Sequence, residues 1–152
     1  MDEVKRILLA EDNANDVELT LAALSEHNLA NEVVVTHDGA EALDYLYRRG
    51  QFKLRKNENP AVVLLDIKMP KMDGIEVLRQ IKSDKNLCNI PVVMLTSSKE
   101  EKDLVESYRL GVNAYVVKPV DFQQFIEAVR NLGLFWAVIN EPPPMETEKT
   151  IS

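Results

Sequence analysis

The sequence has a single cysteine, Cys88, and no long apolar stretch. One cysteine cannot form an internal disulfide bond, which favours a reducing, cytoplasmic location. The longest uninterrupted apolar run, Leu134–Ile139, has six residues, whereas a helix that crosses a bilayer needs about 20. The first residues carry two acidic side chains ahead of a short apolar run, a pattern that does not match a signal peptide. We therefore expect neither a secreted nor a membrane protein.

Basic side chains are scarce relative to acidic ones. The 152 residues include 18 Lys and Arg against 25 Asp and Glu, a net charge of −7. Direct nucleic-acid binding relies on clustered basic side chains, so this balance argues against a nucleic-acid partner. The length suits one domain with a short tail. We expect a folded domain over residues 1–139, a Pro-rich acidic tail over residues 140–152, and no effector domain.

Short apolar runs, mostly of β-branched residues, alternate with segments of helical periodicity. Consecutive apolar positions indicate strands buried on both faces. Strand–helix alternation indicates a parallel sheet with right-handed crossovers. We therefore predict an α/β fold, a doubly wound five-stranded parallel sheet with helices on both faces. The predicted strands are Ile7–Ala10, Val33–Val35, Ala61–Leu65, Pro91–Leu95 and Ala114–Val117.

Polar side chains stand directly after four of these strands. Glu11 and Asp12 follow the first strand and Asp66 follows the third. The hydroxyl cluster at residues 96–98 follows the fourth strand, and Lys118 follows the fifth. Ligands of open parallel sheets bind beyond the carboxyl ends of the strands. Three carboxylates, a hydroxyl cluster and one ammonium group are therefore expected to converge at one edge.

Crowded carboxylates repel one another, and a divalent cation relieves that repulsion. Oxygen-rich sites select Mg²⁺ or Mn²⁺. A cation beside a carboxylate, with a lysine and a hydroxyl nearby, is suited to phosphoryl transfer, and the central carboxylate can act as the nucleophile that forms an acyl phosphate. Taken singly, each side chain has an ordinary interpretation as a helix cap, a solvated loop residue or a surface lysine. The occurrence of all of them at the ends of neighbouring strands favours phosphoryl transfer.

The chain resembles the receiver domains of two-component signalling, the response-regulator family, over about residues 4–138. The resemblance implies the flavodoxin-like (βα)5 receiver fold. It also implies a phosphoprotein that switches a protein surface, and not an enzyme beyond its own phosphotransfer and autodephosphorylation. The matching segments are Ile7–Asn13, Leu64–Gly74, Val93–Ser97 and Gly111–Pro119.

The resemblance assigns the acceptor and the cation site. Asp66 corresponds to the phosphoacceptor, which receives its phosphoryl group from a histidine kinase and shares the Mg²⁺ or Mn²⁺ ion. Asp12 corresponds to a direct metal ligand and Glu11 to one that acts mostly through water. The backbone carbonyl of Lys68 would complete the site.

The resemblance also assigns the switch. Lys118 would pair with the phosphoryl group and with Asp66, and Thr96 would donate a hydrogen bond to a phosphoryl oxygen. Tyr115 corresponds to the aromatic switch residue that moves with Thr96. The peptide bond between Lys118 and Pro119 is typically cis in this family.

Two further positions relate to the lifetime of the acyl phosphate. In this family the side chains two residues after the acceptor and two after the switch threonine influence how water reaches the phosphoryl group. Here they are Lys68, a long cation that departs from the usual pattern, and Ser98. We hypothesise that Lys68 tunes phosphoryl lifetime; the alternative is a solvent-facing lysine that supplies only its carbonyl.

The basic loop before the third strand and the Pro-rich tail resemble stand-alone regulators that accompany bacterial, especially cyanobacterial, phytochrome kinases. This predicts a phytochrome-type sensor histidine kinase as partner, with a phosphotransfer or target protein downstream. The preferred interpretation of the loop is a solvated segment, and the alternative is a contact with an acidic partner. Its basic residues are Arg48, Arg49, Lys53, Arg55 and Lys56.

The apolar side chains near the end of the last predicted helix are more numerous than one buried face of a helix requires. Large exposed apolar patches mark interfaces, which favours homodimerisation through the fourth and fifth helices. The alternative is that these side chains cover the domain's own edge. The residues concerned are Leu104, Val105, Tyr108, Leu132 and Leu134–Ile139.

Three other functions compete with the phosphoacceptor reading. An aspartyl-nucleophile phosphatase needs a second acid two residues after the nucleophile, where this chain has Lys68. A flavodoxin-like electron carrier needs a phosphate-binding loop after the first strand, where Glu11 and Asp12 would repel phosphate. A phosphorylation-independent adaptor would tend to lose the acid pair, the acceptor or the lysine, and all of them are present.

Overall fold

The computed structural model describes residues 6–26, 32–55 and 58–133. Five strands form one parallel sheet in the order β2-β1-β3-β4-β5, which confirms the predicted fold class. No helix in these ranges is long and apolar enough to cross a membrane. The elements are β1 (Ile7–Ala10), α1 (Ala14–Ser25), β2 (Val33–Thr36), α2 (Gly39–Tyr47), η2 (Gly50–Phe52), β3 (Val62–Asp66), α3 (Gly74–Ser83), β4 (Val92–Thr96), α4 (Lys99–Ser107), β5 (Ala114–Val117) and α5 (Phe122–Asn131).

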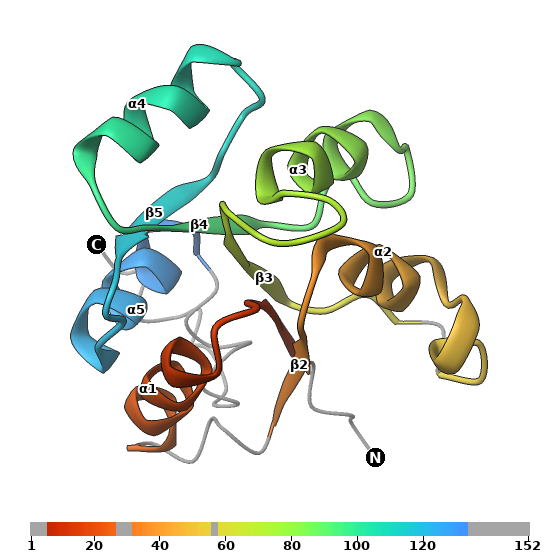
Figure 1. The fold of residues 1–152 in the computed structure, drawn as a ribbon, viewed down its shortest axis with the longest axis horizontal. Coiled ribbons are helices and arrows are strands. Elements are labelled where there is room, and N and C mark those ends of the chain that lie inside the picture. The colour runs from red at the N-terminus through yellow and green to blue at the C-terminus, as the bar shows by residue number, and fades with distance from the viewer. Residues whose placement is uncertain (1–5, 27–31, 56–57, 134–152) are drawn as a thin grey trace, which may run out of the picture.

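The sheet separates two layers of helices, with α1 and α5 on one face and α2, α3 and α4 on the other (Figure 1). Alternate strand residues point to opposite faces, so the fully buried strands divide their side chains between two cores. Leu8, Leu65 and Met94 pack toward α2 and α3. Ile7 and Leu64 pack toward α1 and α5. Both cores hold the central strands rigidly beneath the residues at their carboxyl ends.

Each α-helix begins at a short polar side chain that accepts a hydrogen bond from the backbone N–H three residues later. Asn13, Asp38 and Asp121 are the N-caps of α1, α2 and α5. Asp73 caps α3 and Ser98 caps α4. These caps satisfy N–H groups that have no partner within the helix, and they fix where each helix starts relative to the strand before it.

The predicted dimer surface needs a correction. Val105 on α4 is fully buried in the core, so it is not part of an exposed dimer surface, although Leu104 and Tyr108 are 47% and 46% exposed. Adjacent helical residues point about 100° apart, and Val105 is the member that faces the sheet. The interface residues Leu134–Ile139 and the tail 140–152 lie outside the described residues.

The segment before β3 is also more ordered than a solvated loop. Its Arg55 guanidinium lies 4.1 Å from the Tyr45 ring centroid and donates to backbone carbonyls of Tyr45, Leu46 and Glu58. The Phe52 ring meets Tyr45 edge-on at 5.1 Å. The solvated interpretation is therefore wrong for Arg55, because its half-buried guanidinium contacts backbone carbonyls and the Tyr45 ring. Lys56 lies outside the described residues.

Candidate functional site

The predicted carboxylates meet at the carboxyl edge of the sheet. Glu11 and Asp12 follow β1, and Asp66 is the last residue of β3, the strand beside it. Carboxylate oxygens of the three residues all lie within 4.8 Å of one another. Glu11 is fully buried, Asp66 is 4% exposed and Asp12 is exposed. The acid group therefore has a buried inner side and an open outer side.

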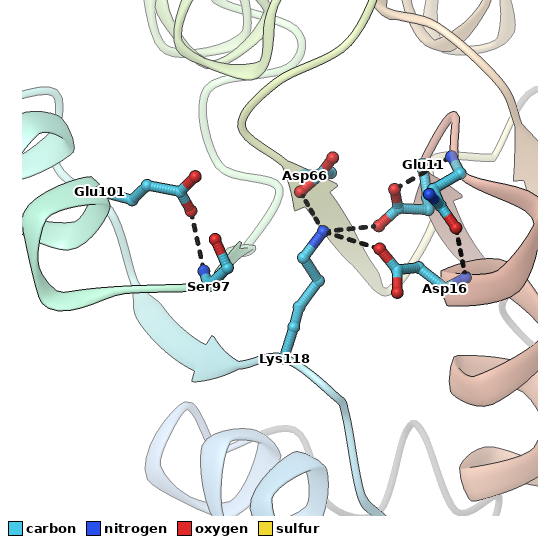
Figure 2. Close-up of polar contacts among 7 residues, drawn as sticks. Glu11, Asp16, Asp66, Ser97, Glu101 and Lys118 are labelled. Carbon is cyan, nitrogen blue, oxygen red and sulfur yellow. Dashed lines mark hydrogen bonds and ion pairs between the residues drawn. The ribbon is translucent and has the colours of Figure 1, made fainter.

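A single ammonium group lies among these acids. Lys118 Nζ is 2.9 Å from Asp66 Oδ1, 3.2 Å from Asp16 Oδ2 and 3.3 Å from Glu11 Oε1 (Figure 2). The Lys118 backbone N–H donates to the Thr96 carbonyl at 2.7 Å, which ties the residue to β4. The Lys118–Pro119 peptide bond is cis. The predicted pairing of Lys118 with Asp66 is thus present.

The site carries more negative charge than its lysine neutralises. Burial and the nearby Asp66 carboxylate raise the pKa of Glu11 to about 7, against the opposing effects of the Asn13 N–H and Lys118. Burial also raises the pKa of Asp66, although Lys118 counteracts it. For Lys118, burial lowers the pKa, but Asp66, Glu11 and Asp16 outweigh that effect and raise it. The raised pKa of Glu11 therefore comes mainly from its burial and secondly from its carboxylate neighbour.

The three carboxylates fit a hard divalent cation. They offer only oxygen donors, which Mg²⁺ and Mn²⁺ prefer. Exposed Asp12 gives an ion access from solvent, and a cation beside Glu11 and Asp66 would offset the repulsion between their carboxylates. Lys68 is exposed in the loop after β3, and its carbonyl as a ligand stays a prediction.

The hydroxyl cluster divides into a buried and a capping part. Thr96, the last residue of β4, is 1% exposed. The Ser98 Oγ accepts from the Glu101 N–H at 3.1 Å, and the Glu101 carboxylate accepts from the Ser97 N–H at 2.8 Å. The structure therefore gives Ser98 the cap role that was its ordinary interpretation. An effect of Ser98 or Lys68 on phosphoryl lifetime stays a prediction.

Tyr115 lies on the α4 side of β5. It is half-buried against the same core as α2 and α3, and Lys102 Nζ lies 5.2 Å from its ring centroid. Burial and Glu106 raise the pKa of its hydroxyl. Thr96 pairs with Val117 in the β4–β5 ladder, two residues beyond Tyr115. The predicted switch residues thus occupy neighbouring strands, with α4 beside Tyr115.

Two glycines allow the backbone to close tightly around the acceptor. A Cβ added to Gly74, the first residue of α3, would lie 2.0 Å from the Asp66 carbonyl oxygen. The Gly74 N–H donates to the Ile67 carbonyl at 2.7 Å. A Cβ at Gly39, the first residue of α2, would lie 2.0 Å from the Met72 carbonyl oxygen. The backbone of the loop between β3 and α3 therefore contacts the start of α3 at one end and the start of α2 at the other.

Sequence reasoning missed two residues, one that contacts Lys118 and one that contacts the residue before it. Asp16, the third residue of α1, lies 3.2 Å from the Lys118 ammonium group. Gln124, the third residue of α5, accepts from the Val117 N–H at 3.1 Å and donates to its carbonyl at 3.3 Å. Their positions in the sequence could have indicated them, because each is the third residue of a helix that starts beside the site.

Comparison with known proteins identifies relatives along most of the chain. The response regulator receiver domain family matches residues 7–130. "Response regulator Rcp1" of Synechocystis sp. (strain ATCC 27184 / PCC 6803 / Kazusa) is 36% identical over 132 residues, covering 87% of this chain and 88% of that protein.

Solved structures give the same picture. The bacteriophytochrome response regulator RtBRR is 60% identical with a TM-score of 0.84, covering 96% of this chain and 88% of that one. The phosphorylated cyanobacterial phytochrome response regulator RcpA is 39% identical with a TM-score of 0.71, covering 94% and 100%. The Mn²⁺-bound form of Rcp1 is 36% identical with a TM-score of 0.68, covering 88% and 94%.

Proposed function

The chain belongs to the response regulator receiver domain family, and we propose that it accepts a phosphoryl group on Asp66 from a sensor histidine kinase. One observation carries the proposal: the Asp66 carboxylate lies at the carboxyl edge of the sheet, 2.9 Å from Lys118 Nζ. An Asp66 oxygen attacks phosphorus and forms an O–P bond. The P–N bond to the kinase histidine breaks, and that nitrogen keeps the electron pair.

Glu11, Asp12, Asp66 and the Lys68 carbonyl would hold Mg²⁺ or Mn²⁺. The acid group supports this, as does the Mn²⁺ in the related Rcp1 structure. When bound, the cation supplies positive charge that offsets the phosphoryl oxygens. Asp12 stays exposed toward solvent, and buried Glu11 holds the inner side of the site.

Lys118 and Thr96 act on the phosphoryl group itself. The Lys118 ammonium, already bonded to Asp66, neutralises a phosphoryl oxygen as charge develops on it. The Thr96 hydroxyl donates a further hydrogen bond to the product. Because Thr96 and Tyr115 lie on adjacent strands, inward movement of Thr96 changes the space open to Tyr115 beside α4. The α4–β5–α5 face then has two states with different partner affinity.

The kinase partner is of the phytochrome type, and the protein acts in the cytoplasm. The support is the likeness to RtBRR and RcpA, which are named as phytochrome regulators. Onward phosphotransfer or a target protein receives the signal. We also propose a homodimer through the α4 and α5 region, where Leu104 and Tyr108 are exposed. Light scattering that gives a monomer mass with and without phosphorylation would overturn the dimer.

The two main rivals are less well supported. In a phosphatase the position two after Asp66 protonates a leaving group, but Lys68 is a cation with an exposed side chain. A phosphorylation-independent adaptor does not need the acceptor, the acid pair and the lysine together. Here all of them are grouped at one edge. The chain therefore acts as a phosphoacceptor and does not turn over an external substrate.

The deciding experiment compares Asp66→Asn with wild type in acetyl phosphate and Mg²⁺. Intact-mass measurement should find one phosphoryl adduct on wild type and none on Asp66→Asn, because an amide is not a competent nucleophile. Asp103→Asn, which removes an exposed carboxylate on α4, is the matched control and should label normally. An adduct that persists on Asp66→Asn would overturn the assignment.

The kinase type is tested separately by transfer of radiolabelled phosphoryl groups. Asp66 should be labelled faster by a phytochrome-type kinase than by kinases with unrelated sensors at the same concentration. Equal rates would leave the acceptor assignment standing and reject the phytochrome partner.

A further inference from the structure

Asp16 differs from the acidic residues at the same position in three other helices. In α3 the third residue, Glu76, pairs with Arg79 of its own helix. The third residue of α2 is Glu41 and that of α4 is Glu101. Glu41 accepts from the His37 N–H at 2.7 Å, and Glu101 accepts from the Ser97 N–H at 2.8 Å. Both side chains fold back on the start of their own helix, as in a capping box.

In α1 the corresponding side chain points away from its own helix. The Asn13 cap already accepts from the Asp16 N–H at 2.9 Å. The Asp16 carboxylate reaches across the site to Lys118, 102 residues away in sequence, at 3.2 Å (Figure 2). Its side chain is only 28% exposed, so solvent screens this ion pair less than a surface pair.

The ammonium group of Lys118 has three N–H donors, and three carboxylates surround it. Two of them, Glu11 and Asp66, belong to the acid group that fits a cation. Asp16 lies outside that group, so it remains available to Lys118 whatever the other two carboxylates bind.

We propose that Asp16 is a positioning residue that holds the Lys118 ammonium over Asp66 from α1 while the other two acids serve the phosphoryl and cation chemistry. The inference rests on the proposed function, because it concerns how that reaction's lysine is aimed. Asp16 itself touches neither phosphorus nor the attacking oxygen. Its contribution is to restrict a long, flexible side chain to one direction, and loss of such alignment slows a reaction without removing a reacting group.

An ordinary role for Asp16 is interaction with the positive end of the α1 dipole, and a double-mutant cycle separates the two. Urea unfolding is measured at pH 8 in EDTA for Asp16→Ala in the wild type and in Lys118→Met. In the wild type the substitution should raise the unfolding equilibrium constant by about tenfold. In Lys118→Met it should leave that constant unchanged or lower it, because only like-charged neighbours remain. An equal increase in both backgrounds indicates the dipole alone and overturns the proposal.

The second measurement does not depend on the folding of Lys118→Met. Asp16→Asn should slow phosphorylation of Asp66 by acetyl phosphate on the order of tenfold, and Asp16→Glu should recover part of the rate. Glu18→Gln, on the next turn of α1 and exposed, is the matched control and should keep the wild-type rate. Unchanged labelling of Asp16→Asn overturns the inference and leaves the acceptor intact. Labelling of Asp66→Asn overturns the proposed function and leaves the unfolding cycle unaffected.

Discussion

Two half-buried cations, Lys118 and Arg55, are held in this domain by different means. Lys118, at the carboxyl edge of the sheet, is surrounded by three carboxylates. Arg55, in the loop before β3, is held by backbone carbonyls and the face of Tyr45. Burial lowers the pKa of both side chains, but the carboxylates reverse the sign at Lys118, whereas Arg55 stays lowered.

The difference separates a cation at the proposed phosphorylation site from one that ties a loop to the domain. The described contacts of Arg55 are with backbone carbonyls and an aromatic ring. The acids around Lys118 exceed its single charge, and the excess is relieved only by another positive species. The comparison predicts that stability at the carboxyl edge depends on cations and pH, whereas stability at the loop does not.

The largest expected effect comes from Lys118→Met. In EDTA at pH 8, removing the ammonium leaves buried carboxylates unpaired, and breaking such a pair costs about 3–5 kcal/mol of unfolding free energy. Mg²⁺ should restore most of the loss, because it supplies the missing charge. The measurement is urea unfolding with and without Mg²⁺. A loss of stability that Mg²⁺ does not reduce would contradict the explanation that unneutralised carboxylates destabilise this edge.

A smaller effect is expected from pH through Glu11. Its pKa rises from about 4.5 unfolded to about 7 folded, so the folded state binds its proton more tightly. The stability that this proton provides is fully present below pH 4.5 and is lost as pH rises through about 7. In EDTA, wild type should lose up to about 3 kcal/mol more than Glu11→Gln between pH 4.5 and 8. Parallel pH profiles for the two proteins would show that Glu11 is not the titrating group.

The smallest effect is expected at the other cation. Arg55→Met should cost about 2 kcal/mol, since it removes hydrogen bonds to backbone carbonyls and a stacked ring contact. Mg²⁺ should leave the loss unchanged, because the loop carries no excess of acid. The control is Lys53→Met, an exposed cation of the same loop, which should be nearly neutral. A loss at Arg55 that Mg²⁺ reverses would break the distinction between the two cations.

The sequence was sufficient to predict the fold and most of the site. Strands buried on both faces are legible as apolar runs, and parallel strands bring their carboxyl ends together whatever the details of packing. That is why Glu11, Asp12, Asp66 and Lys118 were expected at one edge. The strands β3 and β4 each end one residue later than predicted, so Asp66 and Thr96 are the last residues of their strands.

The sequence could not predict contacts that depend on the direction in which a side chain points in the folded chain. The partner of Asp16 is 102 residues away, and an acid in the first turn of a helix is ordinarily explained by the dipole. The contact between Arg55 and the Tyr45 ring follows a turn at Gly50, whose φ is +58°. The exposed Leu104 and the buried Val105 are adjacent apolar residues, and only packing decides which of them faces the sheet.

The contacts at Gly39 and Gly74 hold the loop between β3 and α3 at both of its ends. Its first residues abut the start of α3 and its last residues abut the start of α2, in each case with no side chain between the backbones. Such contacts resist compression and have no rotamer that could yield. We therefore expect a displacement of the Asp66 main chain to press on the start of α3. Between the two contacts the chain bends at Lys71, whose φ is +67°.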